Sequence, residues 1–253
     1  MTLLVVAHGS RDPRHGATVT ALTARVRSLA PGLTVATGFL DFTRPDVEEA
    51  LTRLYADGER DVVAVPLLLR RAYHARADVP AVLSCVLRGL PGLAVRQADV
   101  LGPDPLLYDA LDRRLAEAGA GADAAQRAET GVVLASAGSS DPGTPAAFAR
   151  LAEEWRRASG WAAVLPAYAA TPRPTAAQAV RELRAAGVRR VALAPYMIAP
   201  GRLSDRVMAG AREAGADVTA PVLGAAPELA RIVLDRYRTV RATERVQLKF
   251  TPA

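Results

Sequence analysis

The 253-residue chain has few of the residues that build disulfides and metal centres. It contains one cysteine, Cys85, so it can form no internal disulfide and no thiolate cluster for an iron–sulfur centre or structural zinc. Its only histidines are His8, His15 and His74, and any site built from imidazoles must draw on them. With 50% hydrophobic and 23% charged residues, the composition is that of a globular protein rather than a disordered one.

Long apolar runs and lysine are also scarce. The first apolar run ends at Ala7, which is too short for a signal peptide, and no stretch approaches the ~18 apolar residues of a membrane span. We therefore expect a cytoplasmic protein with no membrane partner. Lys249 is the only lysine among 32 basic residues, and the net charge is +6. Because these residues neither form runs nor alternate with aromatic ones, they do not indicate nucleic-acid binding; arginine forks suit carboxylates instead.

Short β-branched runs alternate with Ala/Leu/Arg-rich segments of helical periodicity in the first half of the chain. The predicted strands are residues 3–7, 33–40, 62–69 and 93–100, and the predicted helices are residues 18–29, 44–55, 78–88 and 105–117. Strands that alternate with helices predict a parallel sheet with right-handed crossovers.

The second half of the chain repeats the first. An offset of 129 residues holds from residue 9 to residue 66, and an offset of 122 then aligns Leu101-Gly102 with Leu223-Gly224. Such regular glycine and proline spacing indicates an internal duplication. We expect an α/β fold of two tandem doubly wound domains with parallel four-stranded sheets. The expected domains are residues 1–120 and 130–240, joined by a linker at 118–130 and followed by a tail at 241–253.

Three polar residues of the first copy are missing from the second. The replacements are His8 by Ala137, Asp41 by Ala170, and His74 by Leu203. All three polar residues follow predicted strands, at the sheet edge where open α/β proteins bind ligands. Because the second copy keeps the framework without them, they are predicted to serve function rather than folding. Imidazoles bind divalent metals, so His8 and His74 are candidate metal ligands. Asp41 has two interpretations. Its carboxylate either binds a metal or accepts protons at this edge, or it caps the helix predicted near Arg44.

Other reactive residues carry weaker arguments. Ser10 lacks the Gly-x-Ser-x-Gly elbow of hydrolases, and the Gly9-Ser10 turn lacks the lysine and glycines of a nucleotide-binding loop. His15 stands in a polar turn and is expected to be a solvated loop or helix-start residue. Cys85 stands in an apolar helical stretch and is expected to be buried and inert.

Three segments together resemble a known family. They are Ala-His-Gly-Ser-Arg-Asp-Pro at 7–13, Phe-Leu-Asp at 39–41 with Pro-Asp-Val-Glu-Glu-Ala-Leu at 45–51, and Val-Pro-Leu-Leu-Leu at 65–69 with Tyr-His-Ala-Arg-Ala-Asp-Val-Pro at 73–80. They look like the class II tetrapyrrole chelatases, the sirohydrochlorin chelatase family of sirohaem and cobalamin synthesis. The chain is similar to the long, two-domain form of that family. At Asp41 the family commonly has glutamate, which is one methylene longer.

The resemblance implies insertion of Fe²⁺ or Co²⁺ into sirohydrochlorin, with the metal ion as substrate and with no nucleotide and no iron–sulfur cluster. It implies that His8 and His74 bind the metal and, with Asp41, form the catalytic group. The residues expected to bind the carboxylates of sirohydrochlorin are Ser10, Arg11, Arg14, Arg70, Arg71, Arg76 and Arg202. We expect a monomer, because the fused copies can satisfy each other's interface. The alternative function is that of a non-catalytic tetrapyrrole or metal carrier.

Overall fold

The computed structural model describes residues 2–70, 78–139, 141–171 and 173–249 of the chain. The chain forms two compact units. The first unit combines the chain up to Asp104 with the chain from Ala225 onward, and the second unit is residues 105–224. The domain boundaries expected above, 1–120, 130–240 and 241–253, follow the sequence repeat rather than these units and stay a prediction.

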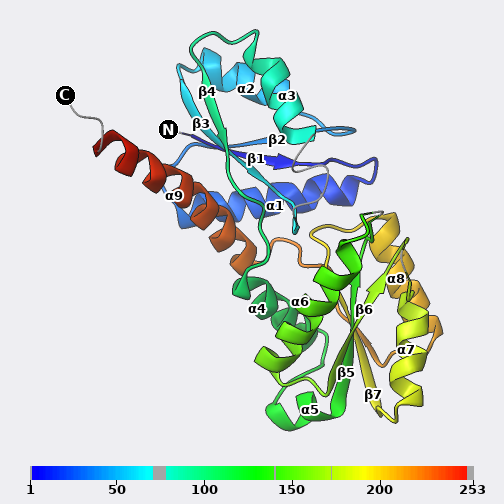
Figure 1. The fold of residues 1–253 in the computed structure, drawn as a ribbon. Coiled ribbons are helices and arrows are strands. Elements are labelled where there is room, and N and C mark those ends of the chain that lie inside the picture. Colours follow the sequence, from blue (N-terminus) through cyan, green and yellow to red (C-terminus); the bar gives the residue numbers. More distant parts are fainter. Residues whose placement is uncertain (1, 71–77, 140, 172, 250–253) are drawn as a thin grey trace. The chain divides into compact units, whose positions relative to one another are not determined.

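The first unit is a parallel sheet of order β2-β1-β3-β4 with helices on both faces (Figure 1). Its elements are β1 (Thr2–Ala7), α1 (Pro13–Leu29), β2 (Val35–Phe39), α2 (Val47–Ala56), β3 (Asp61–Pro66), α3 (Val79–Leu87), β4 (Ala94–Gln97) and α9 (Pro227–Lys249). One face packs on α2 and α3 in an apolar cluster that includes Leu4, Leu51 and Leu83, and α1 and α9 cover the other. Because both faces are covered, β1 is buried along its whole length.

The second unit repeats this plan with the order β6-β5-β7-β8. Its elements are α4 (Pro105–Glu117), α5 (Ala124–Glu129), β5 (Thr130–Ser136), α6 (Thr144–Ser159), β6 (Ala163–Tyr168), α7 (Ala176–Ala185), β7 (Arg190–Pro195), α8 (Arg202–Glu213) and β8 (Val218–Thr219). Helices α7 and α8 cover one face, where Val133, Val180 and Val207 share an apolar cluster. Helices α4 and α6 pack on the strands from the other face.

The two sheets confirm the predicted α/β fold of two parallel four-stranded sheets. Their backbone hydrogen bonds also follow the two sequence offsets, 129 residues early in each copy and 122 residues near its end. The matched pairs are Leu40 N to Ala7 O and Ala169 N to Ser136 O, both at 2.9 Å, and Leu101 N to Leu68 O and Leu223 N to Met197 O, at 2.8 and 2.9 Å. The duplication seen in sequence is therefore a duplication of hydrogen-bonded structure.

The last helix of each sequence copy belongs to the compact unit built on the other copy's strands. Helix α4 follows the strands of the first copy but packs on β7 and α6, whereas α9 packs on α1 and β3. An arginine at the same position anchors each helix. Arg114 donates from Nε and Nη2 to the Leu223 carbonyl at 3.0 and 2.7 Å, and Arg236 donates to the Val100 and Leu101 carbonyls at 2.8 and 2.7 Å. Each sequence repeat and the compact unit built on its strands therefore have the same strands but a different final helix.

The segments predicted to be a linker and a tail both contain helix. The predicted linker at 118–130 holds α5, which begins because Asp123 Oδ1 accepts the N–H of Gln126 at 2.7 Å as its N-cap. Helix α9 continues through Lys249 and so covers much of the predicted tail. Among the described helices, none has both the length and the apolar character that crossing a bilayer requires.

Cys85 is exposed on α3, so the expectation of a buried thiol was wrong. Helix α3 buries Val79, Leu83 and Val86, which form a stripe at helical spacing, and Cys85 lies beside that stripe. Arg88 Nη2 donates to its Sγ at 3.2 Å. An apolar neighbourhood in sequence did not distinguish the buried face of this short helix from its exposed face.

Candidate functional site

The chain changes direction across the first sheet between β1 and β3. From β1 it runs through α1 to β2 on one side, and α2 then returns it to β3 on the other. Such a switch point leaves a crevice at the carboxyl ends of the two strands, where open α/β proteins bind ligands. His8 directly follows β1 and is exposed. Just after β3, the N–H of Leu67 donates to the Val6 carbonyl at 2.8 Å, which holds the two strand ends together.

The segment that follows β3 lies only partly within the described residues. Arg70 is half-buried and is the last residue described before the gap. His74, Arg71 and Arg76 lie outside the described residues, and their predicted roles stay predictions. The described chain enters this segment from the carboxyl end of β3, next to the strand that His8 follows.

The loops after β1 and β2 are joined through their backbones. The N–H of Leu40 donates to the Ala7 carbonyl, and the N–H of Asp41 donates to the His8 carbonyl, both at 2.9 Å. His8 and Asp41 are therefore neighbours across adjacent strand ends, and both are exposed. The structure thus brings together two of the three residues predicted to be catalytic.

Gly9 allows the two loops to come this close. Its φ of +91° lies in the left-handed region, which glycine adopts without steric cost. A Cβ atom added at Gly9 would lie 1.7 Å from the carbonyl oxygen of Asp41. Any larger residue would push the Asp41 loop away from the strand end that carries His8.

The carboxylate of Asp41 does not cap a helix, which removes one of the two interpretations of this residue. Helix α2 is capped by Asp46, whose Oδ1 accepts the N–H of Glu49 at 2.8 Å, while Glu49 accepts the N–H of Asp46 at 3.0 Å. Asp41 Oδ1 accepts a local backbone hydrogen bond, from the N–H of Phe42 at 2.8 Å. Asp41 therefore stands at the sheet edge, where its backbone N–H is bonded to the carbonyl of His8.

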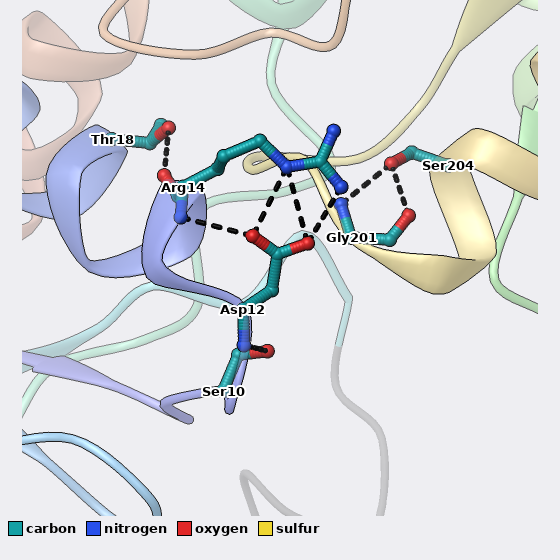
Figure 2. A network of polar contacts seen from close by, with 6 residues as sticks. All are labelled: Ser10, Asp12, Arg14, Thr18, Gly201 and Ser204. Atoms are coloured by element: carbon teal, nitrogen blue, oxygen red, sulfur yellow. Dashed lines mark hydrogen bonds and ion pairs between the residues drawn. The ribbon is translucent and has the colours of Figure 1, made fainter.

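The turn after His8 opens helix α1 with a polar network (Figure 2). Ser10 Oγ accepts the N–H of Asp12 at 3.0 Å, and Asp12 Oδ1 accepts the N–H of Arg14 at 3.0 Å as the helix N-cap. The Arg14 guanidinium also pairs with Asp12, with Nη2 2.6 Å from Oδ2. These bonds from Arg14 lower the pKa of Asp12 below its ordinary value. Ser10 and Arg14 thus shape the turn, and their predicted substrate contacts stay predictions.

Asp12 was not among the predicted site residues, although the sequence carries its signal. Aspartate directly before proline at a helix start is a common N-cap pattern, because proline at the first helical position needs no hydrogen-bond acceptor. What the sequence pattern does not show is the ion pair that ties Arg14 to this cap.

Phe42 is a second site residue that sequence reasoning missed. It follows Asp41 directly, is exposed, and lies with its ring centroid 5.1 Å from Cζ of Arg11. The next residue, Thr43, ties this loop to the first one: its Oγ1 accepts the N–H of Ser10 at 3.2 Å and donates to the Ser10 carbonyl at 3.1 Å. Arg11 and Phe42 therefore meet across the two loops that carry His8 and Asp41.

His15 lies in the first turn of α1 and is half-buried, so it is a helix-start residue but not a solvated one. Its ring packs 6.4 Å from that of Phe39, and its Nδ1 is buried with no hydrogen-bond partner among the described residues. Burial lowers the pKa of His15, the nearby charge of His8 lowers it further, and Asp12 opposes both effects. The lowered pKa favours the neutral form of the His15 imidazole.

The second unit has the same strand-end backbone without the polar groups. The N–H of Ala170 donates to the Ala137 carbonyl at 3.2 Å, which reproduces the bond between Asp41 and His8. Gly138 repeats the close approach of the loops, because a Cβ added there would lie 2.2 Å from the Thr171 carbonyl oxygen. The framework of this edge therefore forms without an imidazole or a carboxylate.

Arg202, the predicted substrate-binding residue of the second copy, is exposed at the start of α8. Beside it, the N–H of Gly201 donates to Ser204 Oγ at 2.9 Å, and Ser204 Oγ donates to the Gly201 carbonyl at 2.8 Å (Figure 2). These hydrogen bonds fix the backbone at the start of α8, where Arg202 lies. Its predicted contact with a substrate stays a prediction.

An exposed imidazole and an exposed carboxylate on two neighbouring loops can each bind a divalent cation and accept protons. Within the described part of the chain, however, no group of three or more His, Cys, Asp or Glu side chains forms a metal site. The second predicted ligand, His74, lies outside that part. Metal binding by His8 and His74 therefore stays a prediction.

Comparison with known proteins gives consistent matches over nearly the whole chain. The chain is 25% identical to the sirohydrochlorin cobaltochelatase of Priestia megaterium over 206 residues, which is 81% of this chain and 67% of that protein. It is 23% identical to the sirohydrochlorin ferrochelatase of the same organism, over 96% of this chain and 91% of that protein. The sirohydrochlorin cobaltochelatase of Methanosarcina acetivorans matches at 28% identity, with 46% of this chain covering 95% of that protein. A short relative thus corresponds to about half of the chain.

Solved structures agree in fold. SirB from Bacillus subtilis with Fe³⁺ superposes with a TM-score of 0.83 at 22% identity, covering 98% of both chains. The structure of CbiX described as the terminal enzyme of sirohaem biosynthesis in denitrifying bacteria gives a TM-score of 0.68 at 23% identity, covering 94% of this chain and 99% of that one. The CbiX family model matches residues 2–118 and again residues 131–240, once for each copy of the repeat. The chain therefore belongs to the CbiX family of class II chelatases.

Proposed function

We propose that this protein is a sirohydrochlorin chelatase that inserts Fe²⁺ or Co²⁺ into the macrocycle without ATP. One observation carries the proposal: exposed His8 and Asp41 are joined at the ligand-binding edge of the first sheet, in a chain of which both halves match the CbiX family. The names of its relatives supply the substrate and the two metals. The second unit, which has Ala137 and Ala170 in place of these two groups, serves as scaffold.

Metal insertion requires that the metal lose its bound water and that two pyrrole N–H groups lose their protons. His8 and His74 hold the divalent ion through neutral imidazole nitrogens, which are good ligands for both iron and cobalt. As the ion passes to the pyrrole nitrogens, each imidazole can accept one of the two protons. One dication enters as two protons leave, so the charge of the macrocycle is unchanged. Asp41, beside His8, stabilises the imidazolium that forms.

Arginine side chains bind the carboxylates at the rim of sirohydrochlorin. The net charge of +6 attracts such a polyanion, and arginine binds carboxylates in a bidentate manner. Arg11 is exposed and stacks on an aromatic ring, whereas Arg14 already donates to Asp12. We therefore assign the stronger contribution to Arg11. Ser10, Arg70, Arg71, Arg76 and Arg202 complete the proposed set.

The test is an anaerobic absorbance assay with sirohydrochlorin and either Co²⁺ or Fe²⁺. The wild-type protein should insert metal faster than a protein-free control, and His8→Ala and His74→Ala should each lower the rate by about 10²-fold or more. Cys85→Ser is the matched control, because it removes the only thiol, another metal-binding group, from an exposed position on α3. This variant should keep the wild-type rate.

The assay also separates the proposal from the carrier alternative. A carrier would shift the spectrum of sirohydrochlorin until one equivalent is bound and would not accelerate insertion. That result, or full activity in the double variant His8→Ala with His74→Ala, contradicts the chelatase proposal.

A further inference from the structure

Phe42 exposes a large aromatic side chain at the sheet edge where the chemistry is proposed. It is 55% exposed, and the other large exposed hydrophobic residues among those described are Leu29 and Leu203. An aromatic ring left in water loses the free energy that burial of its apolar surface would give. Its place after Asp41 makes this ring available to a ligand that binds at the sheet edge.

The ring is held in position by a constrained backbone. Phe42 has φ of 59°, and among the described residues it is the one non-glycine residue with positive φ. Bulky residues rarely adopt this left-handed conformation, and such outliers gather at functional sites. Hydrogen bonds on both sides maintain it: Asp41 Oδ1 accepts the N–H of Phe42 at 2.8 Å, and the Asp41 carbonyl accepts the N–H of Thr43 at 2.7 Å.

The guanidinium of Arg11 lies over this ring. Its Cζ lies 5.1 Å from the ring centroid, which is within the range of a cation–π contact. A guanidinium stacked on a ring keeps its N–H donors in its own plane, so Arg11 can donate to a carboxylate while it stays stacked. The pair therefore places an aromatic ring and an anion-binding group at one point of the sheet edge.

The second copy lacks both members of this pair. By sequence, Ser140 stands at the position of Arg11 and Thr171 at that of Phe42. The loop closure around Gly138 nevertheless resembles that around Gly9. The Arg11–Phe42 pair is thus absent from the copy that also lacks the imidazole and the carboxylate, and the loop does not need it to fold.

We infer that Phe42 and Arg11 bind the macrocycle, with the ring of Phe42 packed against its conjugated face and Arg11 donating to a peripheral carboxylate. This inference rests on the proposed function, because it takes a flat, conjugated polycarboxylate as the ligand. The contact places the pyrrole nitrogens over the edge that carries His8 and Asp41. Phe42 acts in substrate binding and does not contact the metal.

The test compares Phe42→Ala, Phe42→Gly and Phe42→Tyr. Glycine adopts φ of 59° freely, so Phe42→Gly removes the ring without straining the loop, whereas Phe42→Tyr keeps the ring. Binding of metal-free sirohydrochlorin is followed by its fluorescence, and insertion of Co²⁺ is followed by absorbance. We expect the alanine and glycine variants to weaken binding and to raise KM for sirohydrochlorin by about tenfold, within the range measured for stacking on aromatic side chains. Their kcat and their KM for Co²⁺ should change less than about twofold, and Phe42→Tyr should resemble the wild type.

Leu29→Ala is the matched control, since Leu29 is 44% exposed at the end of α1, away from the strand-end loops. It should leave binding and KM unchanged. Wild-type affinity in both Phe42→Ala and Phe42→Gly would overturn the inference, as would weak binding in the alanine variant alone, which would trace the effect to the backbone. If the protein binds sirohydrochlorin through Phe42 but does not accelerate insertion, the chelatase proposal fails and the binding surface stands. If wild-type protein does not bind sirohydrochlorin, both fail.

Discussion

At the scale of single residues, the candidate site depends on backbone contact as much as on reactive side chains. His8 and Asp41 are neighbours because a hydrogen bond joins their main chains and because Gly9 presents no Cβ to the Asp41 carbonyl. The proposed catalytic pair therefore requires a third residue that has no side chain. The second unit keeps the equivalent glycine, Gly138, without this pair, so the close approach belongs to the fold.

Gly9→Ala should disrupt this contact and lower the free energy of unfolding by about 4 kcal/mol or more, since it combines a steric clash with an unfavourable φ. Gly58→Ala is the control, because Gly58 has φ of +89° but nothing within 4 Å of an added Cβ. It should cost about 1–2 kcal/mol, the penalty of the left-handed conformation alone. Urea denaturation measures both values, and equal losses would show that the Asp41 contact does not matter.

At the scale of elements, one carboxylate of helix α4 joins several parts of the second unit. Asp112 Oδ1 accepts hydrogen bonds from the indole N–H groups of Trp155 and Trp161, both at 3.0 Å. Its Oδ2 accepts hydrogen bonds from Ser159 Oγ at 2.7 Å and from Arg127 Nη1 at 3.3 Å. Both tryptophans are fully or almost fully buried, so their N–H groups have little access to water. At the offset of 122, helix α9 has Leu234 in place of this aspartate, and Leu234 is buried. The two copies thus attach equivalent helices by polar and by apolar contacts.

Asp112→Ala should lower the free energy of unfolding of the second unit by about 3–5 kcal/mol, because it leaves buried donors and the Arg127 charge without their acceptor. Asp109→Ala, at an exposed position of the same helix, should change stability by less than about 0.5 kcal/mol. Denaturation followed by tryptophan fluorescence reports directly on this unit, since both tryptophans of the chain lie in it. A similar small loss in both variants would contradict a central role for Asp112.

At the scale of the whole molecule, each compact unit contains the last helix of the other sequence copy: α9 in the first unit and α4 in the second. Helix α9 buries Leu229, Ile232 and Val233 in the first unit, where it packs on α1 and β3. The first unit is therefore complete only when the chain continues past residue 224. The family model, by contrast, matches continuous stretches of sequence at 2–118 and 131–240.

Truncation after Gly224 should expose the apolar surface that α9 covers and should selectively destabilise the first unit. Hydrogen exchange should show loss of protection in β1 and β3, with β5 and β7 still protected. Truncation after Thr243 is the control, because it keeps Leu229, Ile232 and Val233 and should preserve protection in both sheets. Equal protection of β1 and β3 in the two truncated proteins would mean that α9 does not stabilise the first unit.

Local patterns in the sequence were sufficient for much of the architecture. The alternation of strands and helices and the two repeat offsets predicted both sheets, because periodicity and glycine or proline spacing act over a few residues. They also placed His8 and Asp41 after the first and second predicted strands. The burial of individual helix residues was harder to predict from local patterns. Cys85 is exposed and His15 is half-buried, because the elements that pack on a helix decide which of its faces is buried.

By itself, the sequence determined the duplicated α/β framework and the residues that one copy has lost. Only the tertiary structure decided which helix completes which sheet, because α4 and α9 share apolar spacing and an anchoring arginine, Arg114 or Arg236, and no local pattern distinguishes their partners. It also decided that Phe42 stands exposed in a left-handed conformation beside Arg11. Both outcomes depend on contacts between residues far apart in the chain, which local patterns do not encode.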